Sequence, residues 1–114
     1  MKAHQKHLMT CHLAGRQYYD ADLVWDYLRV GKELILEREE TNPHDAFAVK
    51  VGFEKDGEVY HIGYLPRGEN ELVSNLLEMG WDNVFRCVIS SINTDVHPEK
   101  QIYLTISIRN RKDL

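Results

Sequence analysis

The sequence predicts a single, mainly β domain in which short antiparallel strands and two helices form a small closed or nearly closed barrel. Apolar and polar residues alternate in several short runs, which is typical of strands with one buried face. One later segment has apolar residues at helical spacing, acidic residues in its first turn and a glycine after its end. Most connections are too short for the crossovers that parallel strands need, so an antiparallel barrel is the simplest way to bury helix and sheet together.

Six strands are expected, each bounded by turn-forming residues. They span Lys6–Ala14, Lys32–Arg38, Phe47–Phe53, Val59–Leu65, Asn83–Asn93 and Gln101–Arg109. The segment Lys55-Asp56-Gly57-Glu58 predicts a hairpin turn. The segment Thr41–Asp45, with the sequence TNPHD, predicts a turn because proline fixes φ and the side chains of asparagine and aspartate bond back to the backbone.

Two helices are expected between these strands. The shorter one, Asp20–Leu28, ends before Gly31 and has four apolar residues at helical spacing: Leu23, Val24, Tyr27 and Leu28. The longer one, Glu69–Met79, is followed by Gly80 and carries an apolar stripe: Leu72, Val73, Leu76 and Leu77. Acidic residues in its first turn suit the positive end of the helix dipole.

The chain has 114 residues, 43% hydrophobic and 28% charged, which suits one folded domain and excludes wholesale disorder. We expect a flexible tail at 1–7, the domain at 8–110 and a C-terminal tail at 111–114. No apolar run approaches the ~18 residues of a membrane span, and the N-terminus lacks a signal-peptide core. A cytoplasmic protein without a membrane partner is therefore expected.

Cys11 and Cys87 lie in apolar strands and are predicted to be core thiols, with a disulfide as the less favoured alternative.

The net charge of −4 and the pI near 5.8 argue against a general binder of duplex nucleic acid, since such proteins are usually basic. A nucleic-acid site would then have to be a local pocket. No motif for hydrolysis, phosphate binding or dinucleotide binding is present, and the sequence pairs no two carboxylates as acid and base. The sequence predicts a binding domain that is not an enzyme and uses no cofactor.

Three histidines near the N-terminus raise the question of a metal site: His4, His7 and His12, the last beside Cys11. Zinc takes four ligands in tetrahedral geometry. On a strand, Cys11 and His12 point to opposite faces and cannot share an ion. No metal site is expected.

The pair Tyr18-Tyr19 follows Gly15 at the end of the first predicted strand. Neighbouring residues on an extended segment face opposite ways, so one ring can pack inward while the other offers a face for stacking on a base. The alternative, in which both rings are core or interface filler, stays open.

Two polar segments follow later strands. Asp45 can accept a hydrogen bond from a sugar hydroxyl or from the amides of its own turn, and His44 is either exposed or a flat stacking surface. Arg67, close to Tyr64 and before the longer helix, is placed to contact a phosphate.

These segments, in this order, resemble a HIRAN domain, and the resemblance covers about Leu8 to Ile108. It rests on Gly15-Arg16-Gln17-Tyr18-Tyr19, on Leu34–Glu39 followed by Asn42-Pro43-His44-Asp45 and Ala46-Phe47-Ala48-Val49-Lys50-Val51, and on Ile62-Gly63-Tyr64-Leu65-Pro66. The resemblance implies a six-stranded OB-like or SH3-like barrel with one short and one longer helix. It also implies capture of the 3′ end of single-stranded DNA, as in eukaryotic fork-remodelling ATPases. Bacterial members stand alone or accompany nucleases and helicases.

The resemblance also assigns roles to single residues. Tyr18 would stack on a terminal base, and Asp45 would accept from the terminal 3′-hydroxyl. Gln17 stands where DNA-binding members carry arginine, because the arginine here is one place earlier, at Arg16. His44 replaces a tyrosine common at that position. The full candidate set is Gln17, Tyr18, Tyr19, Asn42, His44, Asp45, Tyr64 and Arg67.

The expected function is capture of single-stranded DNA ends in DNA repair or replication-fork processing, with a helicase or nuclease as a partner. The alternative is a protein-interaction or regulatory module on the same fold without DNA binding. Its support is the acidic net charge and the displaced arginine. An enzyme is the third and least supported reading.

Overall fold

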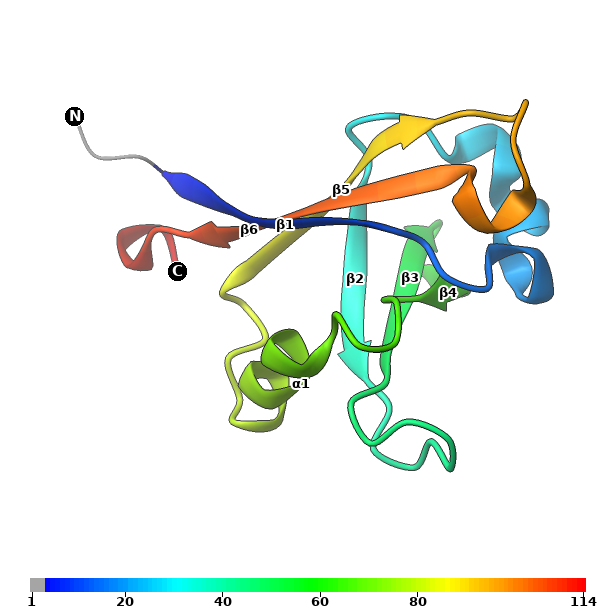
Figure 1. The fold of residues 1–114 in the computed structure, drawn as a ribbon. Coiled ribbons are helices and arrows are strands. Elements are labelled where there is room, and N and C mark those ends of the chain that lie inside the picture. Colours follow the sequence, from blue (N-terminus) through cyan, green and yellow to red (C-terminus); the bar gives the residue numbers. More distant parts are fainter. Residues whose placement is uncertain (1–3) are drawn as a thin grey trace.

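Six antiparallel strands form one sheet in the computed structural model, which describes residues 4–114 (Figure 1). The strands are β1 (Gln5–His12), β2 (Glu33–Arg38), β3 (Val49–Lys55), β4 (Glu58–Tyr64), β5 (Phe85–Ile92) and β6 (Ile102–Arg109). Their order across the sheet is β1-β6-β5-β2-β3-β4. Figure 1 shows β1, β5 and β6 running across the direction of β2, β3 and β4. The predicted mainly β fold with six strands is confirmed.

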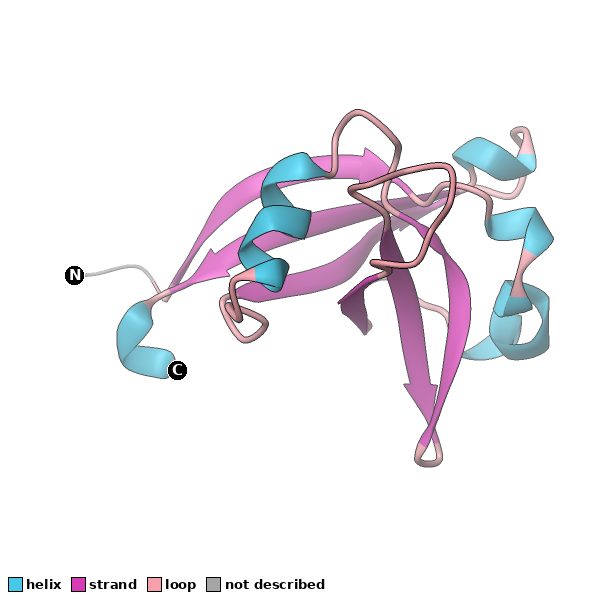
Figure 2. Cartoon of the chain, turned by 90° about the horizontal axis from the view of Figure 1, so that it is seen from below, coloured by secondary structure: helices cyan, strands magenta, loops and turns pink. Residues whose placement is uncertain are grey.

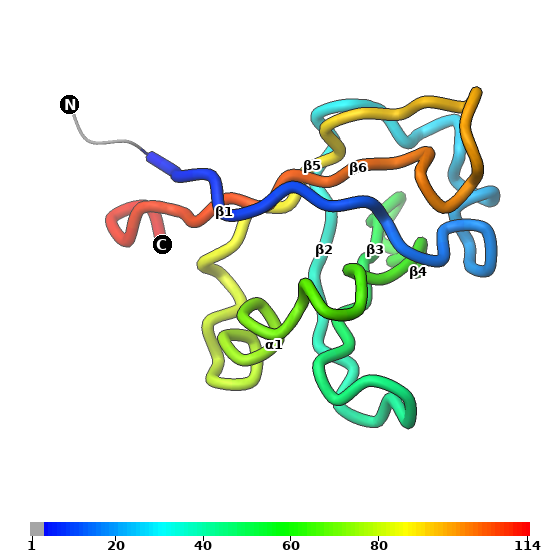
Figure 3. Tube along the Cα trace, viewed as in Figure 1, coloured from blue at the N-terminus to red at the C-terminus, as the bar shows by residue number. Residues whose placement is uncertain are grey.

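The sheet is joined back on itself at one point, which closes the barrel. Beyond the end of β1, the chain passes close to β4 (Figure 3). There the N–H of Ala14 donates to the carbonyl oxygen of Tyr64, and the N–H of Tyr64 donates to that of Ala14, both at 2.9 Å. Gly63 makes this approach possible, because a Cβ at that position would lie 2.7 Å from the Ala14 carbonyl oxygen and 2.7 Å from Leu13 Cδ1.

Strand alternation builds the core, as the sequence predicts. The fully buried side chains include Ile102, Leu104 and Ile106 on β6 and Val49 and Val51 on β3. Cys11 and Cys87 are both buried and free, so the prediction of two core thiols is confirmed. Burial raises the pKa of the Cys11 thiol to about 11, which keeps it protonated and unreactive.

The α-helix α1 (Glu71–Glu78) lies over one face of the sheet (Figure 2). It is shorter than the predicted Glu69–Met79. Val73 is fully buried, and Leu76 and Leu77 pack against the core. Leu72 is 56% exposed, so the packed face is narrower than the predicted stripe. A helix of two turns covers only part of the sheet, and Leu72 lies outside that contact.

The shorter helix has a different geometry from the one predicted. Asp20–Tyr27 forms the 3₁₀ helix η2, not an α-helix. A 3₁₀ helix has three residues per turn, so residues three apart share a face. Ala21 and Val24 are buried on that face, whereas Leu23 is 71% and Tyr27 50% exposed. Residues three apart also lie on one face of an α-helix, so the apolar spacing alone does not distinguish the two helix types.

Three further 3₁₀ turns complete the fold: η1 (Arg16–Tyr18), η3 (Pro98–Lys100) and η4 (Arg111–Asp113). The first three residues of the tail expected at 1–7 lie outside the described residues. In the later part, Gln5, Lys6 and His7 belong to β1 and pair with Arg109, Ile108 and Ser107 of β6. Likewise η4 occupies most of the expected C-terminal tail. Within residues 4–114, no helix is long and apolar enough to cross a bilayer.

The predicted hairpin joins β3 and β4. Asp56 and Gly57 have φ values of 54° and 81°. Positive φ at both central residues is the requirement of the type I′ turn, which matches the twist of a hairpin.

Candidate functional site

The segment after β1 positions the two tyrosines. Gly15 has φ +70°, a left-handed conformation that suits glycine, and turns the chain into η1. Its N–H donates to both carboxylate oxygens of Glu99, at 3.0 and 3.1 Å. Tyr18 ends η1, whereas Tyr19 is extended between η1 and η2. The two rings therefore diverge because the backbone changes conformation between them, not because they alternate along a strand.

Tyr19 belongs to an aromatic cluster with His61 and Tyr64 of β4. Its ring stacks on His61 at a centroid distance of 4.3 Å and an interplanar angle of 28°. Tyr64 meets Tyr19 edge-on at 5.4 Å and His61 at 4.8 Å. Tyr18, by contrast, is 76% exposed. The structure thus brings the second tyrosine, not the first, against the sheet.

His61 is held in this cluster as a neutral ring. Burial lowers its pKa, and its Nε2–H donates to the carbonyl oxygen of Gly63 at 2.9 Å. Sequence reasoning did not select His61, because a histidine in an alternating strand carries no distinguishing signal. Its role becomes visible only when Tyr19 stacks on it.

The turn after β2 is shaped by Asn42. Its Oδ1 accepts from the backbone N–H of His44 at 2.8 Å and of Asp45 at 3.0 Å. This is the Asx-type geometry that the TNPHD sequence predicts. His44 is exposed.

Glu39 connects this turn to the aromatic cluster. Its Oε1 accepts from the Tyr64 hydroxyl at 2.7 Å and from Asn42 Nδ2 at 2.8 Å. The hydrogen bond from Tyr64 lowers the pKa of the Glu39 carboxyl, and burial together with Glu39 raises the pKa of the Tyr64 hydroxyl. Tyr64 is therefore a fixed hydroxyl donor near neutral pH and its ring cannot rotate freely.

Asp45 is held from two sides. Its Oδ1 accepts from the backbone N–H of Phe47 at 2.9 Å, and its Oδ2 accepts from Asn70 Nδ2 at 2.9 Å. Asn70, just before α1, is 1% exposed. Asp45 therefore accepts a hydrogen bond from an amide of its own turn, which is one of the two roles that the sequence predicts for it. Each carboxylate oxygen still keeps a lone pair for a further donor. Asn70 was missed from the sequence because it is 25 residues from Asp45 and looks like an ordinary residue at a helix start.

These side chains line one solvent-open notch of about 220 Å³ at the rim of the barrel. Six of the eight predicted residues contribute to it, together with Ala14, Ala48 and Leu65. The six are Tyr19, Asn42, His44, Asp45, Tyr64 and Arg67. Segments from three separate parts of the chain thus meet at one hollow that is lined by apolar side chains, aromatic rings and a carboxylate.

Gln17 and Tyr18 are the two predicted residues that do not line the notch. Gln17 is half-buried, and its Oε1 has no hydrogen-bond partner within residues 4–114. The neighbouring Arg16 is buried, with its guanidinium 4.2 Å from the Trp25 ring centre and 3.2 Å from Asp22 Oδ1. Arg16 is therefore part of the packing of η1 on η2 and is not available as a surface cation beside the notch.

Arg67 is the cation at the notch. It is exposed, and among the described residues it forms no ion pair. It also lines a second, more open hollow beside Asn70 and Glu71. The part of the chain from His4 onward contains no cluster of three or more histidine, cysteine or acidic residues that could hold a metal ion.

A small antiparallel barrel with an aromatic and carboxylate-lined notch at its rim has the form of a ligand-binding module. The HIRAN domain family model matches residues 7–109, nearly the whole chain. The chain belongs to the HIRAN domain family, whose members are binding modules rather than catalytic domains.

Two solved structures share this fold. A crystal structure of a protein from Lactobacillus plantarum matches with a TM-score of 0.72 and 22% identity, covering 91% of this chain and 94% of that one. The HIRAN domain of human HLTF matches with a TM-score of 0.66 and 14% identity, covering 99% of this chain and 86% of that one. A comparison with curated protein sequences gives no match.

Proposed function

We propose that this HIRAN domain binds the 3′ end of single-stranded DNA in the notch between Tyr19, Tyr64 and Asp45. HIRAN domains are generally single-stranded-DNA-binding modules. The observation that carries the proposal for this chain is the convergence of six motif residues on one open hollow.

The shape and chemistry of the notch suit a terminal nucleoside. Its floor of Ala14, Ala48 and Leu65 is apolar, and Tyr19 adds an aromatic surface that is 40% exposed. Stacking of a base on an aromatic side chain contributes about 1–3 kcal/mol.

Asp45 supplies the recognition of a hydroxyl. A carboxylate accepts hydrogen bonds and donates none, and Asp45 is fixed in place by Phe47 and Asn70. A free 3′-hydroxyl can donate to it, whereas a 3′-phosphate would bring a second negative charge toward Asp45 and Glu39. Arg67 would contact the phosphate that precedes the terminal nucleoside.

The acidic balance of the chain suits this mode of binding. With a net charge of −4, the surface offers little attraction to a continuous duplex. Binding would depend on a few local contacts, so it would be selective for ends. We place the protein in the cytoplasm, acting with a helicase or nuclease in DNA repair or replication-fork processing.

Fluorescence anisotropy with a 5′-labelled oligonucleotide tests the proposal. We expect tighter binding with a free 3′-hydroxyl than with a 3′-phosphate, and loss of this difference in Asp45→Asn. Asp45→Asn should weaken binding of the oligonucleotide with a free 3′-hydroxyl by about tenfold or more, since a hydrogen bond to a charged group contributes about 1.5–3 kcal/mol. Asp95→Asn is the matched control, because Asp95 is an exposed aspartate in the loop between β5 and β6.

Salt dependence separates this function from protein interaction on the same fold. Each phosphate contact contributes a slope of about −0.7 to log K against log salt on a single strand. A slope near zero, with equal binding to both oligonucleotide ends, would exclude capture of nucleic-acid ends. It would favour the protein-interaction module instead.

A further inference from the structure

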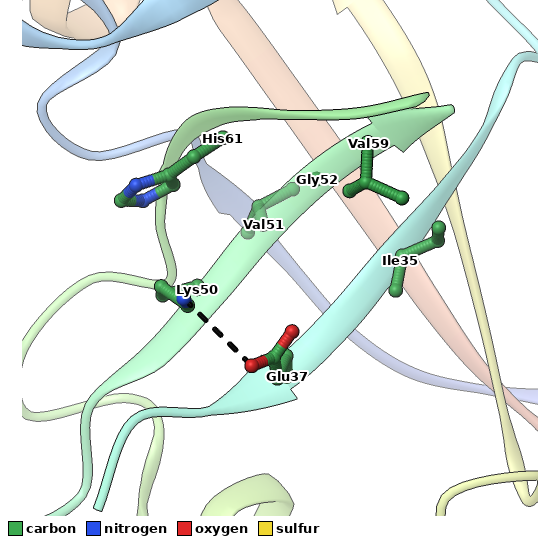
Figure 4. Close-up of a pocket in the computed structure, with 7 residues that line it drawn as sticks. All are labelled: Ile35, Glu37, Lys50, Val51, Gly52, Val59 and His61. Carbon is green, nitrogen blue, oxygen red and sulfur yellow. Dashed lines mark ion pairs between the residues drawn. The ribbon is translucent and has the colours of Figure 1, made fainter. Parts of the chain in front are cut away.

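A second hollow lies on the outer face of β2, β3 and β4. It encloses about 190 Å³ and is lined by two residues of β2, three of β3 and two of β4: Ile35, Glu37, Lys50, Val51, Gly52, Val59 and His61 (Figure 4). We call it the strand groove. Gly52 leaves its centre open, because a Cβ there would lie 2.8 Å from Val59 Cγ1.

The strand groove lies beside the notch, on the other side of the Tyr19–His61 stack. His61 lines the groove and also stacks on Tyr19, which lines the notch. Lys50 of the groove is the cross-strand partner of Tyr64 of the notch, so both side chains lie on the same face of the sheet. A single aromatic cluster, with ring centroids 4.3 to 5.4 Å apart, therefore separates the two hollows.

The strand groove has no excess positive charge. Lys50 Nζ lies 3.7 Å from Glu37 Oε1 and 3.9 Å from Glu39 Oε2. A phosphate would be repelled by the two carboxylates and would have to displace one of them from Lys50. The groove therefore suits an uncharged occupant.

The apolar residues that line the strand groove indicate the chemistry of that uncharged occupant. Ile35 and Val59 are large apolar residues that are 39% and 53% exposed. The groove thus offers apolar walls at one end and an adjacent carboxylate and ammonium at the other (Figure 4). A nucleobase has the same division, because its faces are apolar and its edge carries hydrogen-bond donors and acceptors.

We propose that the strand groove binds the base of the nucleotide next to the 3′-terminal one, with Ile35 and Val59 against its face and Glu37 and Lys50 at its edge. This inference rests on the proposed function, because it requires the terminal nucleoside to occupy the notch. The strand would then pass over the Tyr19–His61 stack between the two sites. The domain would read two nucleotides of the end instead of one.

Abasic substitutions in the oligonucleotide test the groove without altering the protein. We expect an abasic residue next to the 3′-terminal nucleotide to weaken binding about tenfold, in the range of one base contact. The same abasic residue five positions from the 3′ end should leave binding unchanged. Both oligonucleotides keep the free 3′-hydroxyl and the same number of phosphates.

Val59→Ala then ties the effect to the groove. We expect it to weaken binding of the intact oligonucleotide about threefold, from the apolar contact removed, and to leave binding of the penultimate abasic oligonucleotide unchanged. Val96→Ala, at an exposed valine in the loop between β5 and β6, is the matched control and should change neither.

The outcomes separate the two proposals. Equal binding of the two abasic oligonucleotides, with a 3′-phosphate still weakening binding, would overturn the groove as a base site and leave end capture standing. Binding that ignores the 3′-hydroxyl and both abasic positions would overturn end capture, and the groove assignment with it.

Discussion

Asn70 supports the notch from inside the protein, so truncating it should destabilise the fold measurably. Its side chain is 1% exposed and its Nδ2 donates to Asp45 Oδ2 at 2.9 Å. Asn70→Ala removes this bond and leaves Asp45 with the Phe47 amide as its remaining partner among the described residues. A hydrogen bond to a charged group contributes about 1.5–3 kcal/mol, and Asp45 is half-buried, so water compensates in part. We expect the free energy of unfolding to fall by about 2 kcal/mol.

Urea denaturation followed by circular dichroism measures this loss, and a thermal scan should show Tm lower by about 8 °C for a domain of this size. Asn75→Ala is the matched control, because Asn75 is exposed on α1 and alanine favours a helix there. A loss below about 0.5 kcal/mol, or a loss equal to that of the control, would refute the claim that Asn70 holds Asp45 in place.

Three further predictions follow from the same geometry. Tyr19→Ala should weaken oligonucleotide binding by about 1–3 kcal/mol and Tyr18→Ala by clearly less, because Tyr19 lines the notch; anisotropy showing the larger loss at Tyr18 would contradict this. The unfolding free energy should fall as pH drops below about 6.5, since the unfolded chain takes up a proton on His61 that burial disfavours in the folded state; His61→Gln should flatten this slope, and an unchanged slope would argue against it. Gly63→Ala should lower stability by about 1–3 kcal/mol, because its Cβ would lie 2.7 Å from the Ala14 carbonyl oxygen, and an unchanged urea midpoint would disprove the close approach.

The strands and α1 were predictable because local periodicity follows from which face of each element is buried. The hairpin at Asp56-Gly57 was predictable for a similar reason, since its two residues favour the positive φ that the turn needs. The type of the Asp20–Tyr27 helix was not predictable. Its apolar residues suit either helix geometry, and only contact with the rest of the fold determines that Ala21 and Val24 face inward while Leu23 faces out.

The residues of the site also fall into two groups, those that the sequence could identify and those that it could not. Asn42 and Asp45 lie in a turn whose hydrogen bonds are local, so the sequence was sufficient to identify them. Glu39 and Asn70 act through partners 25 residues away, Tyr64 and Asp45, and no local pattern reports such contacts. The choice between Tyr18 and Tyr19 depends on the change from η1 to extended backbone, which alternation along a strand does not describe.

The two hydrogen bonds between Ala14 and Tyr64 also connect ligand occupancy to the integrity of the barrel. Both residues line the notch, so a bound nucleoside contacts the two edges of the sheet where they meet. Opening the barrel at this point would release the ligand, and a bound ligand therefore disfavours that opening by mass action. Amide hydrogen exchange at Ala14 and Tyr64 should therefore slow when a ligand occupies the notch.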